Sequence, residues 1–232
     1  MNYSSIIENR IEQFNPNEII VARKLIVEEL SGVPETAFFK ALERMIRQNA
    51  LVRISKGIYC RPKKTRFGVI QANEKAIIQY FTGNNKNGMI IGYRLYNNKG
   101  LTTQISKTTE LYSNLITEEN KMVRNISIFK LNMQMEESTV KMIEAMEILQ
   151  NCKQIEDLNS RVFASYLKKT ADNYSNEAAM EVLGRMKYKK STIAFLENIL
   201  NHYGVKNTLS RFLSRTSKYE FPKMEGIYEI TH

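Results

Sequence analysis

The chain contains 232 residues, with 34 Lys and Arg against 24 Asp and Glu and a formal net charge of +10. Hydrophobic residues make up 43% and charged residues 25%, and no apolar stretch approaches the roughly 20 residues that cross a bilayer, which excludes a disordered chain and a membrane span. Because the chain has only two cysteines, far apart in sequence, and two histidines, we expect neither a disulfide framework nor a metal site, and no other cofactor.

The first segment predicts two helices separated by a short strand. The first five residues lack the basic and apolar regions of a signal peptide, so we expect a cytoplasmic location. Apolar residues at helical spacing predict a helix over 3–14, β-branched residues predict a short strand over 17–21, and a second helix is expected over 23–29. Gly32 then suits the positive φ of a helix end, and Pro34 suits the first turn of the next helix.

A third helix, over 34–49, has two contrasting faces. Apolar side chains such as Phe38 and Leu42 occupy one face, and polar or charged side chains occupy the other. Two short β-prone runs, 51–54 and 58–60, follow, and the glycine between them predicts a hairpin. Helices followed by a hairpin in this order are typical of a winged helix-turn-helix, in which the third helix enters the major groove of DNA and the hairpin reaches the neighbouring backbone.

Positive charge is concentrated on this predicted domain. Residues 40–66 contain nine Lys or Arg and a single acid, a net charge of +8. We interpret Thr36 and Lys40 as candidates for base contacts, and Arg44 and Arg47 as candidates for base or backbone contacts. The candidates for neutralising phosphates are Arg53, Lys56, Arg61, Lys63, Lys64 and Arg66. Two alternatives stay open, a solvated face of an amphipathic helix and a surface that docks another protein.

The rest of the chain predicts a mixed region that becomes helical toward its end. A short helix is expected over 74–81, and β-prone runs over 108–115 and 122–131, separated by an acidic turn, predict a small antiparallel sheet. From about residue 138 onward apolar residues recur at helical spacing, and Gly204 is expected to end one of these helices.

These elements together predict an α+β fold in two domains. Residues 1–67 form the winged helix-turn-helix, and residues 68–232 form a mixed α/β effector domain that is helical from about residue 138. A second basic patch in this domain consists of Arg185, Lys187, Lys189 and Lys190. The patch is a candidate for holding phosphates, and a solvated loop between two helices is the alternative.

The sequence lacks the common motifs of catalysis. It contains no phosphate-binding loop of the G-x-x-x-x-G-K-[ST] type, no G-x-G-x-x-G dinucleotide fingerprint and no G-x-S-x-G nucleophile elbow. Cys60 has no histidine near it in sequence, and the adjacent acidic pairs at 118–119 and 136–137 point apart on regular structure. We therefore do not expect an enzyme.

Three segments resemble the AbiEi-type antitoxins, the regulators of type IV toxin–antitoxin and abortive-infection systems. The first comprises 31–33 (SGV), 40–45 (KALERM) and 51–59 (LVRISKGIY). The second is 92–104 (GYRLYNNKGLTTQ), and a weaker one lies at 211–219. The resemblance implies an N-terminal winged helix-turn-helix and a repressor of its own operon. It also implies an antitoxin that counteracts a cognate nucleotidyltransferase-like toxin.

The leading hypothesis is a sequence-specific transcriptional regulator that binds double-stranded DNA. A single winged helix reads only a short half-site, so we expect an inverted repeat occupied by a homodimer or by two cooperatively bound monomers. The competing hypothesis is a protein-interaction module that docks its winged helix onto a protein partner and does not bind DNA. No membrane partner is expected.

Overall fold

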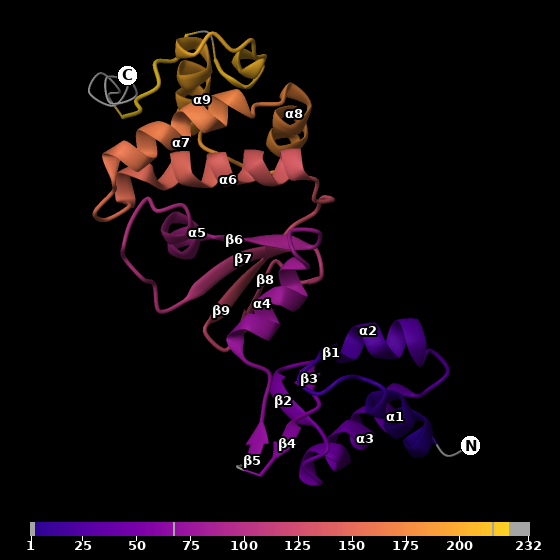
Figure 1. The fold of residues 1–232 in the computed structure, drawn as a ribbon. Helices are drawn as coiled ribbons and strands as arrows, with labels where there is room; N and C mark the ends of the chain where they lie inside the picture. Colours follow the sequence, from indigo (N-terminus) through magenta and orange to yellow (C-terminus); the bar gives the residue numbers. More distant parts are fainter. Residues whose placement is uncertain (1–2, 67, 215, 223–232) are drawn as a thin grey trace. The chain divides into compact units, whose positions relative to one another are not determined.

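The chain folds into an α+β structure, with helices and small sheets along its length (Figure 1). The computed structural model describes residues 3–66, 68–214 and 216–222. The chain forms two compact units, which consist of Met1–Phe81 with Met122–Ile126 and of Thr82–Lys121 with Ser127–His232. The first unit thus reaches Phe81, beyond the boundary expected at residue 67, and takes in a short segment from the middle of the chain.

The first unit combines helices with a three-stranded sheet. Its elements, in chain order, are α1 (Tyr3–Glu12), β1 (Ile19–Val21), α2 (Ala22–Lys24), α3 (Glu35–Arg47), β2 (Val52–Ser55), β3 (Ile58–Cys60), β4 (Lys63–Thr65), β5 (Gly68–Ile70) and α4 (Glu74–Thr82). The strand order is β1-β3-β2, and β3 pairs antiparallel with both neighbours. Strands β4 and β5 form a separate antiparallel pair.

The elements predicted for the start of the chain are present, with two differences in detail. The predicted helix over 23–29 is divided into the short α2 and a π-helical turn, Leu25–Glu29, in which the Leu30 amide donates to the Leu25 carbonyl at 3.1 Å. The expectation that Gly32 adopts a positive φ is wrong. The turn is closed instead by the Val33 amide, which donates to the Leu30 carbonyl at 2.8 Å.

One apolar core holds the helices of the first unit together. Ile7 and Ile11 of α1 are fully buried, and Phe38, Leu42 and Met45 of α3 face them in the same cluster. Burying a side chain of this size contributes about 1.5–3 kcal/mol relative to leaving it in water. Because these apolar residues fix one side of α3 in the core, the opposite side of the helix lies at the surface.

The second unit contains most of a four-stranded sheet and a set of helices. Its elements, in chain order, are β6 (Gly88–Ile91), α5 (Gly92–Asn98), β7 (Thr109–Ser113), β8 (Asn120–Val123), β9 (Ile126–Lys130), α6 (Glu137–Asn151), α7 (Ser160–Asp172), α8 (Asn176–Arg185) and α9 (Lys190–His202), except that the end of β8 and the first residue of β9 belong to the first unit. The strand order is β6-β7-β9-β8, and β6 pairs antiparallel with β7. Gly88 permits this pairing, because a Cβ there would lie 1.9 Å from the Tyr112 carbonyl oxygen.

Two predicted elements of this region differ from the structure. The run 122–131 is not one strand, because the chain turns at Arg124, which has a φ of 56°, and so separates β8 from β9. The helix expected after residue 207 is a single 3₁₀ turn, Leu209–Phe212. The predicted stop at Gly204 is confirmed: its φ is 68°, and the Val205 amide donates to the Leu200 carbonyl at 2.8 Å.

The helices of the second unit lie on one side of the sheet. In Figure 1, α6 runs along the sheet and α7, α8 and α9 lie beyond it. Helix α6 contacts β6, α5, α8 and α9, which explains why most of its side chains are buried. None of the helices within the described residues combines the length and the apolar character needed to cross a membrane.

Candidate nucleic-acid interface

Helix α3 carries a row of polar side chains opposite its core-facing side. Thr36, Lys40, Glu43 and Arg47 are exposed and recur at intervals of three or four residues, so they lie along one side of the helix. We call these four residues the α3 stripe. Phe39, at the edge of the stripe, is 37% exposed. The stripe therefore offers a hydroxyl and two cations, interrupted by one carboxylate and flanked by an exposed ring.

Arg44 lies on the flank of α3 that faces α1. Its guanidinium forms an ion pair with Glu8 and donates to the Ser4 hydroxyl, and both partners belong to α1. This contact follows from the packing of α1 against α3. Arg44 was predicted together with Lys40 and Arg47 as a DNA contact, and the structure gives it an additional role within the unit.

The hairpin between β2 and β3 turns at Lys56 and Gly57. Gly57 has a φ of 75°, a conformation that glycine adopts without a steric cost, and its carbonyl accepts from the Ala22 amide at 2.9 Å. The exposed Lys56 therefore sits at a turn that is tied to the start of α2. Arg53 on β2 is also exposed, and it lies opposite Tyr59 of β3. Burial raises the pKa of Tyr59, and the charge of Arg53 opposes this shift.

Arg61, which was predicted to contact phosphate, makes internal contacts. Its guanidinium donates to the main-chain carbonyls of Glu12 and Phe14, at the end of α1. The Asn17 amide in turn donates to the Arg61 carbonyl at 2.7 Å. Carbonyls at the end of a helix lack partners within the helix, so Arg61 connects the end of α1 to the segment that follows β3.

A two-stranded ribbon, which was not predicted, follows this sheet. Strand β4 carries the exposed Lys63 and Lys64, and Arg66 lies in the turn before β5. On β5, Val69 is 52% exposed and Ile70 is 50% exposed. The β-branched pair after Gly68 is the sequence signal that indicates such a strand. The ribbon brings three predicted phosphate contacts together on one short hairpin.

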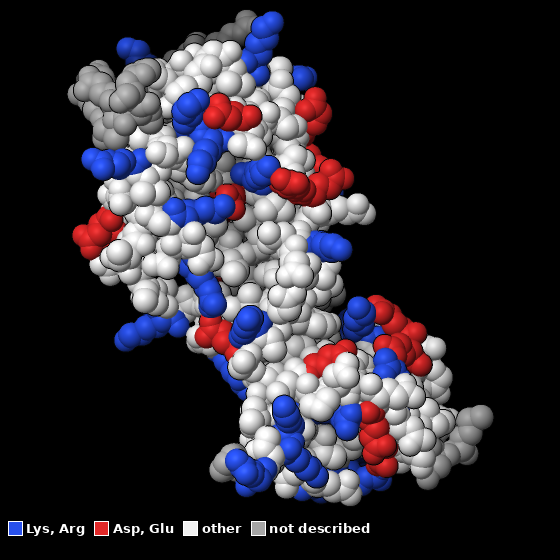
Figure 2. All heavy atoms as spheres, in the orientation of Figure 1, with Lys and Arg blue, Asp and Glu red and all other residues white. Residues whose placement is uncertain are grey.

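Opposite charges occupy different parts of the first unit. Ion pairs involving α1 and the following helical segment neutralise Arg10, Lys24 and Arg44 through Glu29, Glu28 and Glu8. Figure 2 shows Lys and Arg side chains gathered over the region of β2, β4 and β5, and Asp and Glu side chains over α1 and α2. Apart from Arg61, whose partners are main-chain carbonyls, the predicted contacts of the first unit that form no ion pair within the described part of the chain are Lys40, Arg47, Arg53, Lys56, Lys63 and Lys64.

The second predicted basic patch is only partly available to a partner. Arg185 lies 3.7 Å from the Glu181 carboxylate and donates to the Asn132 carbonyl at 3.1 Å, and Lys190 donates to the Phe212 carbonyl. The side chains of Lys187 and Lys189 are exposed. The arrangement of this run is thus determined largely by contacts inside the second unit.

Next to this run, a buried carboxylate connects α6 to the sheet. Glu147 is 7% exposed, and its Oε1 accepts from the Tyr112 hydroxyl at 3.0 Å and from the Tyr188 hydroxyl at 3.1 Å. Burial raises the pKa of Glu147, and the two hydroxyl donors oppose this shift. Burial also raises the pKa of both tyrosines, so they remain donors. No local sequence signal indicates this cluster, because its members lie far apart in the chain.

The segment 100–104, which carries part of the family resemblance, is held by the loop before α7. The Thr102 hydroxyl donates to the Glu156 carbonyl at 2.7 Å, and the Gln104 amide donates to the Asp157 carboxylate at 2.6 Å. Gly100 has a φ of 69° just after the end of α5, in a conformation that glycine adopts without a steric cost. These contacts give the segment a structural role in the second unit.

Comparisons with known proteins give one family match. The sequence profile of a family described as "Family of unknown function (DUF6088)" matches residues 7–171. No curated protein matches the chain. Among solved structures, the crystal structure of the RV2827C protein from Mycobacterium tuberculosis is similar over 88% of this chain and 78% of that chain, with 10% sequence identity and a TM-score of 0.43. The family segment includes every candidate DNA contact of the first unit.

Proposed function

We propose that this chain, which belongs to the DUF6088 family of unknown function, binds double-stranded DNA through a winged helix-turn-helix in its first unit. The observation that carries the proposal is the α3 stripe. Lys40 and Arg47 are exposed on the side of α3 that faces away from the core, and neither has an ion-pair partner among the described residues. A helix with one side fixed in a core and a basic side in solvent has the form needed to enter a major groove.

The proposed contacts fall into two groups. Thr36, Lys40 and Arg47 of the α3 stripe contact bases, and Lys56 at the β2–β3 turn, together with the β4–β5 ribbon, contacts phosphates. Phosphate contacts supply affinity that depends on salt but not on sequence, whereas base contacts supply specificity. A single unit of this size reads a short half-site, so the proposed target is an inverted repeat occupied by two copies of the chain.

We further propose that the chain is a cytoplasmic repressor of its own operon and the antitoxin of a nucleotidyltransferase-like toxin. The support is the resemblance of 40–45, 51–59 and 92–104 to the AbiEi-type antitoxins. Co-expression tests this part: the chain is expected to restore growth to cells that express the product of an adjacent nucleotidyltransferase-like reading frame. Absence of such a frame, or failure to restore growth, contradicts the antitoxin role and leaves the DNA-binding proposal standing.

A specific observation favours a second candidate function, the docking of a protein partner. Glu43 places a carboxylate in the middle of the α3 stripe, where it repels phosphate, and Phe39 exposes an aromatic ring beside it. Aromatic side chains are enriched in protein interfaces relative to the rest of the surface. Glu43→Ala distinguishes the two functions: it is expected to strengthen DNA binding if the stripe enters the negatively charged groove, whereas a chain whose stripe only docks a protein is expected to bind no duplex with or without this change.

A titration with fluorescently labelled duplex tests DNA binding directly. The probe is the DNA upstream of the gene, with a shuffled duplex of equal length as the reference. Lys40→Ala is expected to cost about 1–3 kcal/mol on the upstream duplex and much less on the shuffled one. Lys56→Ala is expected to weaken binding to both duplexes equally and to reduce the salt slope by about 1.

Lys24→Ala is the matched control for these variants. Lys24 is an exposed lysine of the same unit, and its ammonium lies 3.9 Å from Glu28, so it is not one of the uncompensated cations. We expect this variant to bind like the unaltered chain. Equal binding by all three variants, or no binding to either duplex at low salt, rejects the DNA-binding proposal.

A further inference from the structure

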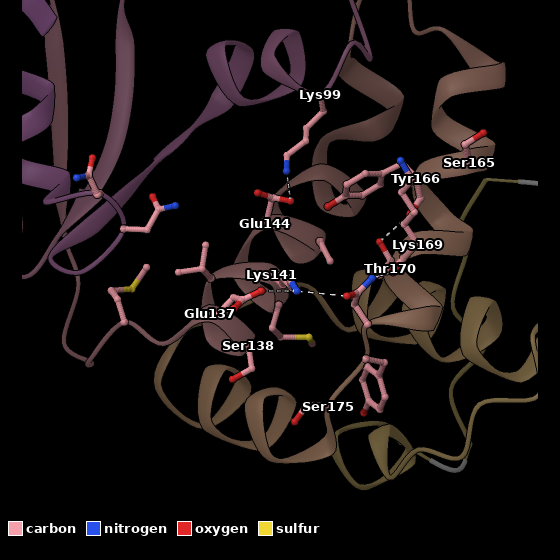
Figure 3. Close-up of a pocket in the computed structure, with 18 of the residues that line it drawn as sticks. Lys99, Glu137, Ser138, Lys141, Glu144, Ser165, Tyr166, Lys169, Thr170 and Ser175 are labelled. Atoms are coloured by element: carbon pink, nitrogen blue, oxygen red, sulfur yellow. Dashed lines mark hydrogen bonds and ion pairs between the residues drawn. The ribbon is translucent and has the colours of Figure 1, made fainter.

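The second unit contains a pocket of about 640 Å³ between α6, α7 and two turns (Figure 3). The turn 84–86 borders it on one side, and the turn 173–175 between α7 and α8 borders it on another. A pocket of this volume falls within the range of about 300–1,000 Å³ that is usual for small-molecule sites. None of the residues discussed above as DNA contacts lines it.

Part of the pocket wall is apolar and aromatic. Val140, Met142 and Ala145 of α6 are buried beneath it, and the rings of Tyr166 and Tyr174 form part of its lining. Burial and the charge of Glu144 raise the pKa of Tyr166, which therefore stays a neutral phenol. This wall suits a flat ring, because ring faces and aliphatic side chains exclude water together.

The charges that line the pocket do not balance. Its two carboxylates are each neutralised: Glu144 lies 2.6 Å from the Lys99 ammonium, and Glu137 lies 2.7 Å from Lys141, as Figure 3 shows. Two further lysines, which are Lys86 and Lys169, line the pocket and form no ion pair within the described residues. The uncompensated charge of the lining is therefore positive, and it matches a group with about two negative charges.

The turn at the rim has an unusual backbone. Gly83, Asn84 and Asn85 have consecutive φ values of 54°, 55° and 67°, in the left-handed region that non-glycine residues rarely adopt. The Asn87 amide, which donates to the Thr82 carbonyl at 3.0 Å, closes this turn. The conformation presents two adjacent amide side chains at the rim, and amides both donate to and accept from the edge of a base.

We infer that this pocket binds a nucleoside 5′-monophosphate, with the phosphate at Lys86 and Lys169 and the base against Tyr166. The three parts of such a ligand correspond to three parts of the lining: a dianion to the uncompensated lysines, a planar ring to the aromatic and aliphatic wall, and polar base edges to Asn84 and Asn85. The inference is independent of DNA binding, because all of these residues belong to the second unit.

Thermal unfolding and isothermal titration calorimetry of the full chain test the site. The probes are AMP, GMP, CMP and UMP, with the four nucleosides and inorganic phosphate as references. At a concentration about five times its Kd, at least one monophosphate is expected to raise the Tm by about 2–4 °C. The nucleosides and inorganic phosphate are each expected to bind at least about tenfold more weakly, because each lacks one half of the contacts.

Lys169→Gln and Lys168→Gln form a matched pair of variants. Lys169 lines the pocket, whereas its neighbour Lys168 does not and instead lies 3.5 Å from Asp172. Lys169→Gln is expected to weaken monophosphate binding about tenfold, and Lys168→Gln to leave it unchanged. Lys86→Gln, in the turn 84–86, is expected to weaken monophosphate binding as Lys169→Gln does, and agreement between the two variants excludes a folding defect in one of them as the cause.

The inference is overturned by any of three results. The first is that none of the four monophosphates binds or raises the Tm. The second is that nucleosides bind as well as the monophosphates, which would show that the phosphate contact is not made, or that inorganic phosphate does, which would show that the ring contact is not made. The third is that Lys169→Gln and Lys168→Gln have equal effects on monophosphate binding, which would show that the binding site lies elsewhere.

Discussion

Arg44 of α3 and Glu8 of α1 form an ion pair that links the two helices of the first unit. The Arg44 side chain is 48% exposed and that of Glu8 33% exposed, so water screens their attraction. The pair therefore orients α3 rather than supplying much stability. It also reduces the positive charge that Arg44 offers to a partner, although Arg44 lies on the helix proposed to contact DNA.

A double-mutant cycle on this pair should reveal a small coupling. Arg44→Ala and Glu8→Ala are each expected to lower the free energy of unfolding by about 1 kcal/mol or less, with a coupling energy of about 0.2–1 kcal/mol. Urea unfolding measures all four corners of the cycle. Arg44→Ala is also expected to weaken DNA binding less than Lys40→Ala. A larger effect of Arg44→Ala on DNA binding would show that its ion pair opens when DNA is bound.

Arg61 should matter for folding more than for DNA binding. Because its guanidinium satisfies the carbonyls of Glu12 and Phe14, Arg61→Ala leaves both without a charged donor and is expected to lower the free energy of unfolding by about 1–3 kcal/mol. Hydrogen exchange is expected to rise at the end of α1. The matched variant Lys64→Ala, whose exposed side chain has no ion pair among the described residues, should leave stability within about 0.5 kcal/mol. Equal destabilisation by both variants would argue against the internal role of Arg61.

The hairpin turn should depend on Gly57. Its φ of 75° costs an alanine about 1–2 kcal/mol, so Gly57→Ala is expected to lower the free energy of unfolding by this amount. Gly32→Ala is the control, because Gly32 lies outside the left-handed region and has open space where a Cβ would be. We expect it to be neutral or to stabilise by up to about 1 kcal/mol. Urea unfolding measures the free energy of unfolding of both variants. Similar losses in both would contradict the role given to the positive φ of Gly57.

The stability of the second unit should depend on pH through Glu147. Its folded-state pKa is raised, mainly by burial, above the unfolded value. Below the unfolded pKa of about 4.3 both states are protonated; as the pH rises toward the folded pKa, the unfolded state ionises first and stability is lost. Glu147→Gln keeps an Oε1 acceptor for Tyr112 and Tyr188 but does not ionise. The variant should therefore gain stability relative to the unaltered chain as the pH rises above the unfolded pKa of about 4.3.

Thermal unfolding of the two proteins across this pH range measures the difference. A constant difference in Tm would mean that Glu147 ionises alike in the folded and unfolded states. A variant that is less stable at every pH, by an increasing margin as the pH rises, would mean that the carboxylate is stabilised by its hydroxyl donors more than it is penalised by burial.

Local sequence signals predicted most elements of the first unit and the end of one helix in the second unit. The spacing of Phe38, Leu42 and Met45 predicts both the helix and the side of it that is buried, because a helix repeats every 3.6 residues. The hairpin at Gly57 and the helix stop at Gly204 were predicted from the conformational freedom of glycine. The turn at Arg124 was missed, because a non-glycine residue with positive φ leaves no comparable signal in the sequence.

Among the candidate DNA contacts, the sequence by itself determined which side chains carry charge and which side of α3 is polar. Only the tertiary structure decided which cations remain available, because Glu8 and the carbonyls that engage Arg44 and Arg61 lie more than thirty residues away in the chain. For the same reason, only the tertiary structure showed that Glu147 is buried and that lysines from different segments line one pocket. A charge, a hydroxyl or a ring is a property of one residue, whereas its neutralisation, burial and partners depend on segments that meet only when the chain folds.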